Sequence, residues 1–161
     1  MDKKVYFIVE DGGRSNRGHI YHDGIKHAPA GYKVTIEEPA KSRDMECKYH
    51  AMISDIAKHC TFMGKKWDRE SWKRLLIEAF VQVMREEAIA NGERDPFVGQ
   101  GMSAPSLDGM RIVQLGVQSR GFSKRMGSAF IEYLYSYGST HGVVWSNSSK
   151  SYINEWAKEK E

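Results

Sequence analysis

The chain has 161 residues, of which 40% are apolar and 28% are charged, and its formal net charge at pH 7 is +3. These values are ordinary for a soluble globular protein long enough to bury a core, and the mild basic excess permits an anionic partner without requiring one. No apolar run approaches the roughly 20 residues of a membrane-spanning helix, so we expect no membrane partner.

The N-terminus reads Met-Asp-Lys-Lys and continues as an apolar strand-like run rather than as a signal peptide. The chain has two cysteines, Cys47 and Cys60, which fall within one predicted helix. Their separation corresponds to roughly 20 Å along a helix, which is too far for a disulfide. These features predict a cytoplasmic protein with reduced thiols.

The first part of the chain is predicted to be mainly extended. The apolar run from Val5 to Val9 indicates a strand, and residues 11–30, rich in Gly, Arg, His and Asn, indicate an irregular loop or a weak helix. Tyr32, Val34 and Ile36 then alternate with polar residues, which predicts a half-buried strand that ends before Pro39.

Two amphipathic helices follow. The first is predicted between Arg43 and Cys60, capped by Ser42 or Asp44. Its expected inward face comprises Met45, Tyr49, Met52, Ile53, Ile56 and Cys60, with Lys48, Asp55 and Lys58 on the opposite face. After Gly64 the second helix begins at the cap Asp68 and ends at Asn91-Gly92. Its expected inward stripe comprises Trp72, Leu75, Leu76, Ala79, Phe80, Val83 and Met84.

The C-terminal part is predicted to contain a hairpin and two further helices. Phe97-Val98 is expected to pair with Met110–Val117. Ser123 should cap a helix that ends at Tyr137 with Gly138 in the C′ position, and whose inward residues are Met126, Phe130, Tyr133, Leu134 and Tyr137. After an extended piece at 143–145, Asn147 or Ser148 should cap a last helix carrying Tyr152, Ile153 and Trp156.

These elements predict a single α+β domain over residues 1–161. It is mostly helical, with three to four main helices and a small antiparallel sheet, because no internal repeat, heptad run or low-complexity linker divides the chain.

Cations gather at the starts of three predicted helices, and no acidic residue occurs between 109 and 131. Because the helix macrodipole favours acids at these positions, the cations suggest contact with an anion, and exposed backbone N–H groups there could hold phosphates. An ordinary solvated charged face is the open alternative. The three groups are Lys41, Arg43 and Lys48; Lys65, Lys66, Trp67, Arg69, Lys73 and Arg74; and Arg111, Arg120, Lys124 and Arg125.

The two tryptophans in the second group have different expected roles. Trp72 falls on the inward stripe and is predicted to belong to the core. Trp67 precedes the cap, so it either staples the helix entry or stands exposed and stacks on an unpaired base.

Catalytic and metal sites have little support. A zinc site could be assembled from His19, His22, Cys47 and His50, but the usual ligand spacings are absent, so no cofactor is expected. The carboxylates that could hold Mg²⁺ for a nuclease are scattered and lie mostly beside cations; they are Asp44, Glu46, Asp55, Asp68 and Glu70. Neither a phosphate-binding loop nor a G-x-S-x-G elbow is present.

The order of segments resembles the NinB family of phage recombination proteins, with the match covering about residues 32–156. Its most specific parts are Trp67-Asp68-x-Glu70-Ser71-Trp72-Lys73 and Gly138-x-x-x-Gly142-Val143-x-Trp145-Ser146. The chain departs from the family pattern at Met45-Glu46, where a Gln-Asn pair is usual, and at His50, where a tryptophan is common.

The resemblance implies a non-enzymatic mediator in the bacterial host cytoplasm, with no cofactor. It implies binding to single-stranded DNA, contact with the single-strand-binding protein, help in loading a recombinase, and a homodimer with a basic channel. Trp67 or Phe122 is then expected to stack on bases. The expected DNA-binding set is Lys41, Arg43, Lys48, Lys65, Lys66, Trp67, Arg69, Lys73, Arg74, Arg120, Lys124 and Arg125. The alternatives are a metal-dependent nuclease or resolvase of a phage recombination module, and a module that binds an acidic protein tail.

Overall fold

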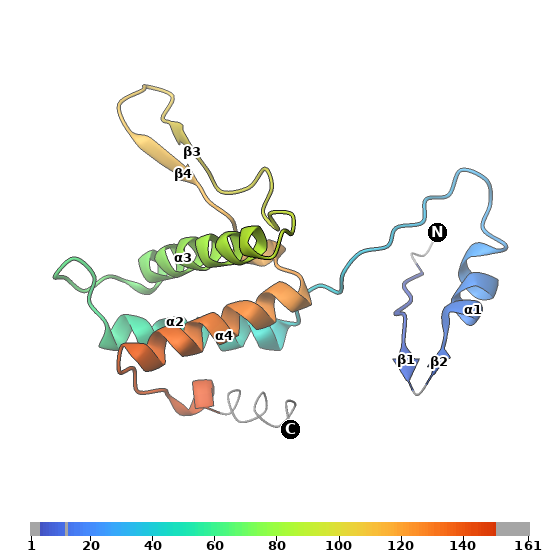
Figure 1. Cartoon of the computed structure of the whole chain (residues 1–161), viewed down its shortest axis with the longest axis horizontal. Coiled ribbons are helices and arrows are strands. Elements are labelled where there is room, and N and C mark those ends of the chain that lie inside the picture. The colour runs from blue at the N-terminus through green and yellow to red at the C-terminus, as the bar shows by residue number, and fades with distance from the viewer. Residues whose placement is uncertain (1–3, 12, 151–161) are drawn as a thin grey trace. The chain divides into compact units, whose positions relative to one another are not determined.

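The structure, a computed structural model, describes residues 4–11 and 13–150. The chain divides into two compact units, Met1–Glu37 and Glu38–Glu161. Together they confirm the predicted fold class, α+β and mostly helical with small antiparallel sheets (Figure 1). Within the described residues, no helix is both long and apolar enough to cross a membrane.

The N-terminal unit carries only short elements. Strands β1 (Glu10–Asp11) and β2 (Arg14–Ser15) pair antiparallel, and α1 (Arg17–Ile20) continues into the π-helical turn η1 (Tyr21–Ile25). Of the two interpretations of residues 11–30, the weak helix is therefore confirmed over 17–25, and the irregular loop is wrong there.

The prediction of two longer strands, at Val5–Val9 and around Tyr32–Ile36, is wrong. Residues 5–9 and 32–39 lie outside any strand, and Ile36 is 87% exposed. None of the described residues in this unit is buried. Alternating apolar residues form a stable strand only where a partner strand pairs with them and a core buries their side chains. A unit this short supplies neither.

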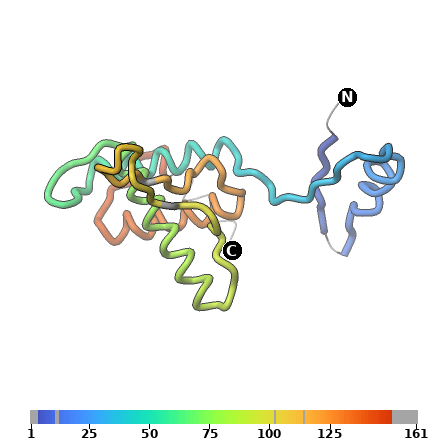
Figure 2. Tube along the Cα trace, turned by 90° about the horizontal axis from the view of Figure 1, so that it is seen from above, coloured from blue at the N-terminus to red at the C-terminus, as the bar shows by residue number. Residues whose placement is uncertain are grey.

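Three long helices make up most of the second unit: α2 (Arg43–His59), α3 (Arg69–Ala90) and α4 (Lys124–Thr140). Helices α2 and α4 run in the same direction and α3 runs the opposite way (Figure 1). Figure 2 shows that α3 crosses the other two at an angle. The ring centroid of Trp72, at the start of α3, lies 6.2 Å from that of Tyr137, near the end of α4. In the middle of the same two helices, the ring centroids of Phe80 and Phe130 are 5.1 Å apart.

Each long helix begins at a predicted capping residue. The backbone N–H of Met45 donates to the Ser42 hydroxyl, that of Ser71 to the Asp68 carboxylate, and that of Met126 to the Ser123 hydroxyl. These caps satisfy N–H groups that the first turn leaves without partners, so the sequence alone locates all three helix starts.

The core lies between these helices and confirms most of the predicted inward faces. Trp72, expected in the core, is 2% exposed. On α3, however, Ile77 and Val81 are buried whereas Ala79 and Val83 are exposed. The stripe is rotated because α3 packs on two helices at once, which widens the buried face beyond a simple 3/4 pattern.

A hairpin follows α3, but with a different first strand from the predicted one. Strand β3 (Met102–Pro105) pairs antiparallel with β4 (Ile112–Leu115), with Met102 opposite Leu115. Phe97 is instead buried against Phe80 and Phe122. Arg85 of α3 holds the connecting loop by donating to Asp95 at 3.2 Å and to the Gln100 carbonyl at 2.9 Å. The short 3-10 helix η2 (Ser119–Gly121) then leads into α4.

The C-terminal segment corrects two further predictions. Helix α4 continues to Thr140, so Gly138 lies inside it, and Gly142, with φ +68°, is the glycine after its end. Helical structure resumes over residues 147–150. The residue before it is Ser146, so the predicted caps Asn147 and Ser148 both lie inside the helix. The predicted positions Tyr152, Ile153 and Trp156 lie outside the described residues.

Asp55 is buried beneath this segment rather than on the solvent face of α2, with 3% exposure. One of its carboxylate oxygens accepts three hydrogen bonds, from the Ser146 backbone N–H and hydroxyl, each at 2.9 Å, and from the Ser149 hydroxyl at 2.7 Å. Burial by itself would raise the pKa of Asp55, but these hydrogen bonds outweigh it and hold the pKa below its usual range. The carboxylate therefore ties the C-terminal segment to α2.

Candidate nucleic-acid interface

The starts of α2 and α4 lie together. Ala40 and Ser123 form an antiparallel bridge, and the Lys124 backbone N–H donates to the Pro39 carbonyl at 2.7 Å. The Lys41 ammonium donates to the Arg120 carbonyl at 2.9 Å, and its side chain is only 8% exposed. The Lys41 side chain therefore links the start of α2 to the segment before α4.

Four exposed cations surround this junction and form what we call the α4 end: Arg43, Arg120, Lys124 and Arg125. Arg125 contacts Glu38 at 3.6 Å, but both side chains remain more than half exposed, so solvent screening leaves the pair weak. These cations are accessible to an anionic ligand.

The second group, at the start of α3, we call the α3 end: Lys65, Lys66, Trp67, Arg69, Lys73 and Arg74. Lys65, Lys66, Arg69 and Arg74 are exposed, and Arg69 contacts its neighbour Glu70 at 3.7 Å. Burial lowers the pKa of His50 on α2, and the charges of Lys73 and Arg69 lower it further.

The structure separates the two ends. Because α3 runs opposite to α2 and α4, its start lies where they finish (Figure 1). The 17 residues of α2 correspond to roughly 25 Å between its two ends. Lys48 lies between them, half-buried on α2, and Arg111 is exposed on the hairpin. A ligand that touches both ends must therefore extend along the helices, as a nucleic-acid strand can.

The aromatic residues expected to stack on bases are less accessible than predicted. Phe122 is 5% exposed and packs against Phe80 and Phe130 at 5.9 and 5.6 Å, so its predicted stacking role is wrong. Trp67 is half-buried against the core, and its indole N–H donates to the Phe62 carbonyl at 2.8 Å. The Lys65 ammonium lies 3.9 Å from the Trp67 ring centroid. The arrangement favours a structural role for Trp67 at the helix entry.

Two apolar residues beside these cations were missed from the sequence. Met63 is 81% exposed and Phe62 is 42% exposed, immediately before Gly64 and Lys65. The sequence does contain a pattern that could have indicated them, namely an apolar pair directly before a glycine and two lysines.

Three of the five scattered carboxylates have structural roles. Asp68 caps α3, Asp55 holds the C-terminal segment, and Glu46 accepts from the Tyr49 hydroxyl at 3.2 Å. In the part of the chain that the structure describes, no three His, Cys, Asp or Glu side chains lie close enough to hold a metal ion. Cys47 is exposed and Cys60 is buried, and both are free thiols.

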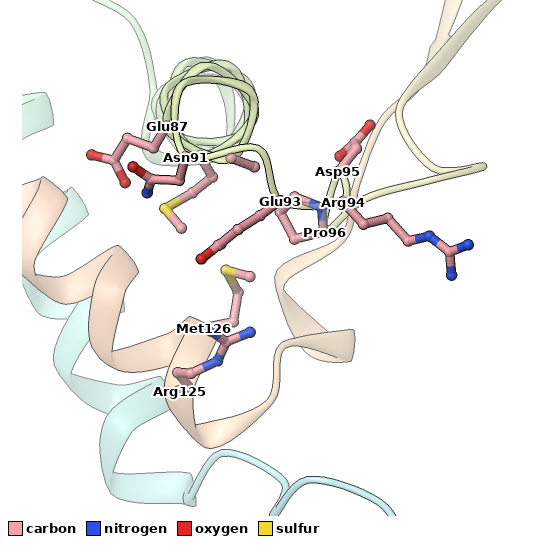
Figure 3. Close-up of a pocket in the computed structure, with 10 residues that line it drawn as sticks. Glu87, Asn91, Glu93, Arg94, Asp95, Pro96, Arg125 and Met126 are labelled. Atoms are coloured by element: carbon pink, nitrogen blue, oxygen red, sulfur yellow. The ribbon is translucent and has the colours of Figure 1, made fainter.

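A cavity of about 360 Å³ lies between the end of α3 and the start of α4 (Figure 3). Its lining mixes both charges with two thioethers and comprises Met84, Glu87, Ala88, Asn91, Glu93, Arg94, Asp95, Pro96, Arg125 and Met126. Such mixed charge does not select one small anionic or cationic ligand, so the exposed basic ends remain the stronger candidate site.

The family model described as NinB protein matches residues 2–146. The chain belongs to the NinB family. The resemblance seen in the sequence began at about residue 32, whereas the family model begins to match at residue 2. The N-terminal unit therefore belongs to the NinB region.

Several NinB proteins are similar along nearly the whole chain. Protein ninB of Escherichia phage lambda is 24% identical over 156 residues, covering 97% of this chain and 94% of the relative. The P21 prophage-derived protein NinB of Escherichia coli is 23% identical with the same coverage. A solved structure described as a structural genomics NinB has a TM-score of 0.52 at 22% identity, and the similarity covers 92% of this chain and 99% of that one. This likeness supports the fold.

Proposed function

We propose that this NinB family member is a non-enzymatic, single-stranded DNA-binding accessory protein of phage recombination. In this proposal it helps to load a recombinase on DNA coated by single-strand-binding protein, in the cytoplasm of the bacterial host. The observation that carries the proposal is the α3 end, where four exposed cations gather at a helix start and two exposed apolar side chains, Phe62 and Met63, come directly before them. Cations can neutralise phosphates while apolar groups contact unstacked bases.

A homodimer is part of the same proposal. The N-terminal unit and the hairpin expose large apolar side chains, including Phe7, Ile36 and Ile112. Exposed apolar surface of this kind is typical of a protein-protein contact. Light scattering should give twice the monomer mass, and a monomer at micromolar concentration would contradict this part alone.

The α3 end is tested by replacing Lys65, Lys66 and Arg69 together with Ala. We expect the affinity for a single-stranded oligonucleotide to fall by about 10-fold or more, because fewer counterions are released on binding. The slope of log affinity against log salt should become shallower by about 2, since each lost phosphate contact contributes about 0.7. Fluorescence anisotropy at several salt concentrations measures both quantities.

The matched control replaces three exposed cations outside both basic ends, Lys26, Lys33 and Arg94, and should leave affinity and slope nearly unchanged. Equal losses in the two triple variants would indicate a net-charge effect and contradict the assignment. Binding to an acidic protein tail but not to free DNA would support the interaction module. Mg²⁺-dependent cleavage of single-stranded or branched DNA, abolished by a chelator, would support the nuclease.

The α4 end has its own prediction. Replacing Arg120, Lys124 and Arg125 with Ala should weaken binding to an oligonucleotide of about 20 nucleotides more than to one of about 3, because so short a strand cannot reach across the roughly 25 Å between the ends. Anisotropy with the two lengths measures this ratio. The same loss for both lengths would show that the two ends do not share one strand.

A further inference from the structure

The turn that joins α2 to α3 has an unusual residue at its tip. Phe62 and Lys65 form an antiparallel bridge, in which the Phe62 N–H donates to the Lys65 carbonyl at 3.0 Å and the Lys65 N–H donates back at 3.3 Å. The two residues between them, Met63 and Gly64, have φ values of +52° and +75°. We call these four residues the Met63 turn.

Met63 occupies a conformation that its side chain disfavours. Among the described residues other than glycine, it is the one with positive φ. Tight turns with two positive φ values normally use Gly, Asn or Asp, because a β-carbon crowds the backbone there. The side chain packs little in return, since Met63 is 81% exposed. Folding alone therefore does not account for a methionine at this position.

The Met63 turn is flanked by cations and supported by an aromatic side chain. Lys65 closes the turn and Lys66 follows it. The Lys65 ammonium lies over the Trp67 ring, and the Lys66 ammonium donates to the Lys58 carbonyl. Phe62 supports the turn from within, with its ring 6.5 Å from that of Trp72 at 65°. The result is a projecting thioether with cations beside it.

We propose that Met63 is the base-contacting residue of the α3 end and that it inserts between unstacked bases of single-stranded DNA while Lys65 and Lys66 meet the flanking phosphates. This inference rests on the proposed function and names the contact residue within it. Thioethers make favourable contacts with aromatic rings, and apolar wedges such as Met separate neighbouring bases in other DNA complexes. Phe122 is buried and Trp67 is tied to the Phe62 carbonyl, which leaves Met63 and the edge of Phe62 as the accessible apolar groups here.

The decisive variant is Met63→Gly, for which stability and binding should change in opposite directions. Glycine tolerates positive φ, so the melting temperature should rise by a few degrees or stay the same. The affinity for a single-stranded oligonucleotide should fall about 3- to 10-fold, because the base contact is lost. The salt slope should not change, because no phosphate contact is removed. Thermal unfolding followed by circular dichroism and anisotropy titrations measure these quantities.

A fluorescent base gives a direct readout. An oligonucleotide containing 2-aminopurine should brighten on binding to the wild-type chain, as its bases unstack, and brighten less with Met63→Ala. The matched control is Val98→Ala, because Val98 is 65% exposed on the loop between α3 and the hairpin, outside both basic ends, and should leave brightening and affinity unchanged.

Three outcomes separate the claims. Unchanged affinity of Met63→Gly, while the Lys65, Lys66 and Arg69 variant is weakened, would overturn this inference and leave the proposed function standing. A fall in both melting temperature and affinity would assign Met63 a structural role and would also overturn it. Failure of the wild-type chain to bind any oligonucleotide would contradict the proposed function and this inference together.

Discussion

Replacing Asp55 with Ala should destabilise the fold by about 3 kcal/mol, because three hydrogen-bond donors then lose a charged acceptor and a buried site is left unfilled. The donors are the backbone N–H and hydroxyl of Ser146 and the hydroxyl of Ser149. Asp55→Asn should cost less, because its amide oxygen can still accept some of these bonds. Urea unfolding followed by circular dichroism measures the free energy of unfolding.

A control and a pH series sharpen this prediction. Glu86→Ala, an exposed carboxylate on α3, should change stability by no more than about 0.5 kcal/mol. Because the folded-state pKa of Asp55 is lowered, its contribution is complete above the unfolded pKa near 3.8 and is lost as the pH falls through the folded value. The stability difference between wild type and Asp55→Ala should therefore be constant from pH 5 to 7 and shrink below about pH 4. A difference that grows on acidification would contradict the hydrogen-bonded carboxylate.

Gly138→Ala should destabilise the protein by about 2 kcal/mol, even though Ala is the better helix former. A β-carbon at this position would lie 2.3 Å from Cζ2 and 2.4 Å from Cη2 of Trp145, so the indole has to move. That ring is also stacked on Tyr135, with 6.1 Å between centroids, and this contact would be disturbed. Thermal unfolding measures the change.

Gly127 on the same helix is the matched control. A β-carbon there would lie 3.4 Å from the end of the flexible Met45 side chain and 3.4 Å from the Lys41 β-carbon. Gly127→Ala should therefore be neutral or stabilising, by up to about 1 kcal/mol. The cost of Gly138→Ala should also shrink in a Trp145→Ala background, because the clash is then absent. An equal cost in both backgrounds would place the strain elsewhere.

Local signals predicted much of the second unit. A serine or aspartate before each long helix bonds to a backbone N–H within its own first turn, so such a start needs no distant contact. Apolar spacing likewise identified Tyr49, Phe80 and Phe130 as inward residues, and they are buried. The family motif around Trp145 was visible in the sequence, although the reason for it, an indole lying on Gly138, was not.

The errors arose where distant segments meet. Asp55 has the spacing of a solvent-facing residue and is buried only because residues 143–149 fold back over it. Phe122 reads as an exposed aromatic next to cations, yet it fills the space between Phe80 and Phe130. The alternation at Tyr32, Val34 and Ile36 is typical of a strand, but a strand also needs a partner and a core.

For the candidate interface, the sequence by itself determined which residue types are present: cations crowded at helix starts, with tryptophans and an apolar pair nearby. Only the tertiary structure decided their grouping, because the direction of α3 places its basic start at the opposite end from those of α2 and α4. The tertiary structure also engages Lys41 and Phe122 in internal contacts, and it leaves the Met63 side chain exposed to solvent. Composition is local to the chain, whereas exposure depends on which elements pack against each other.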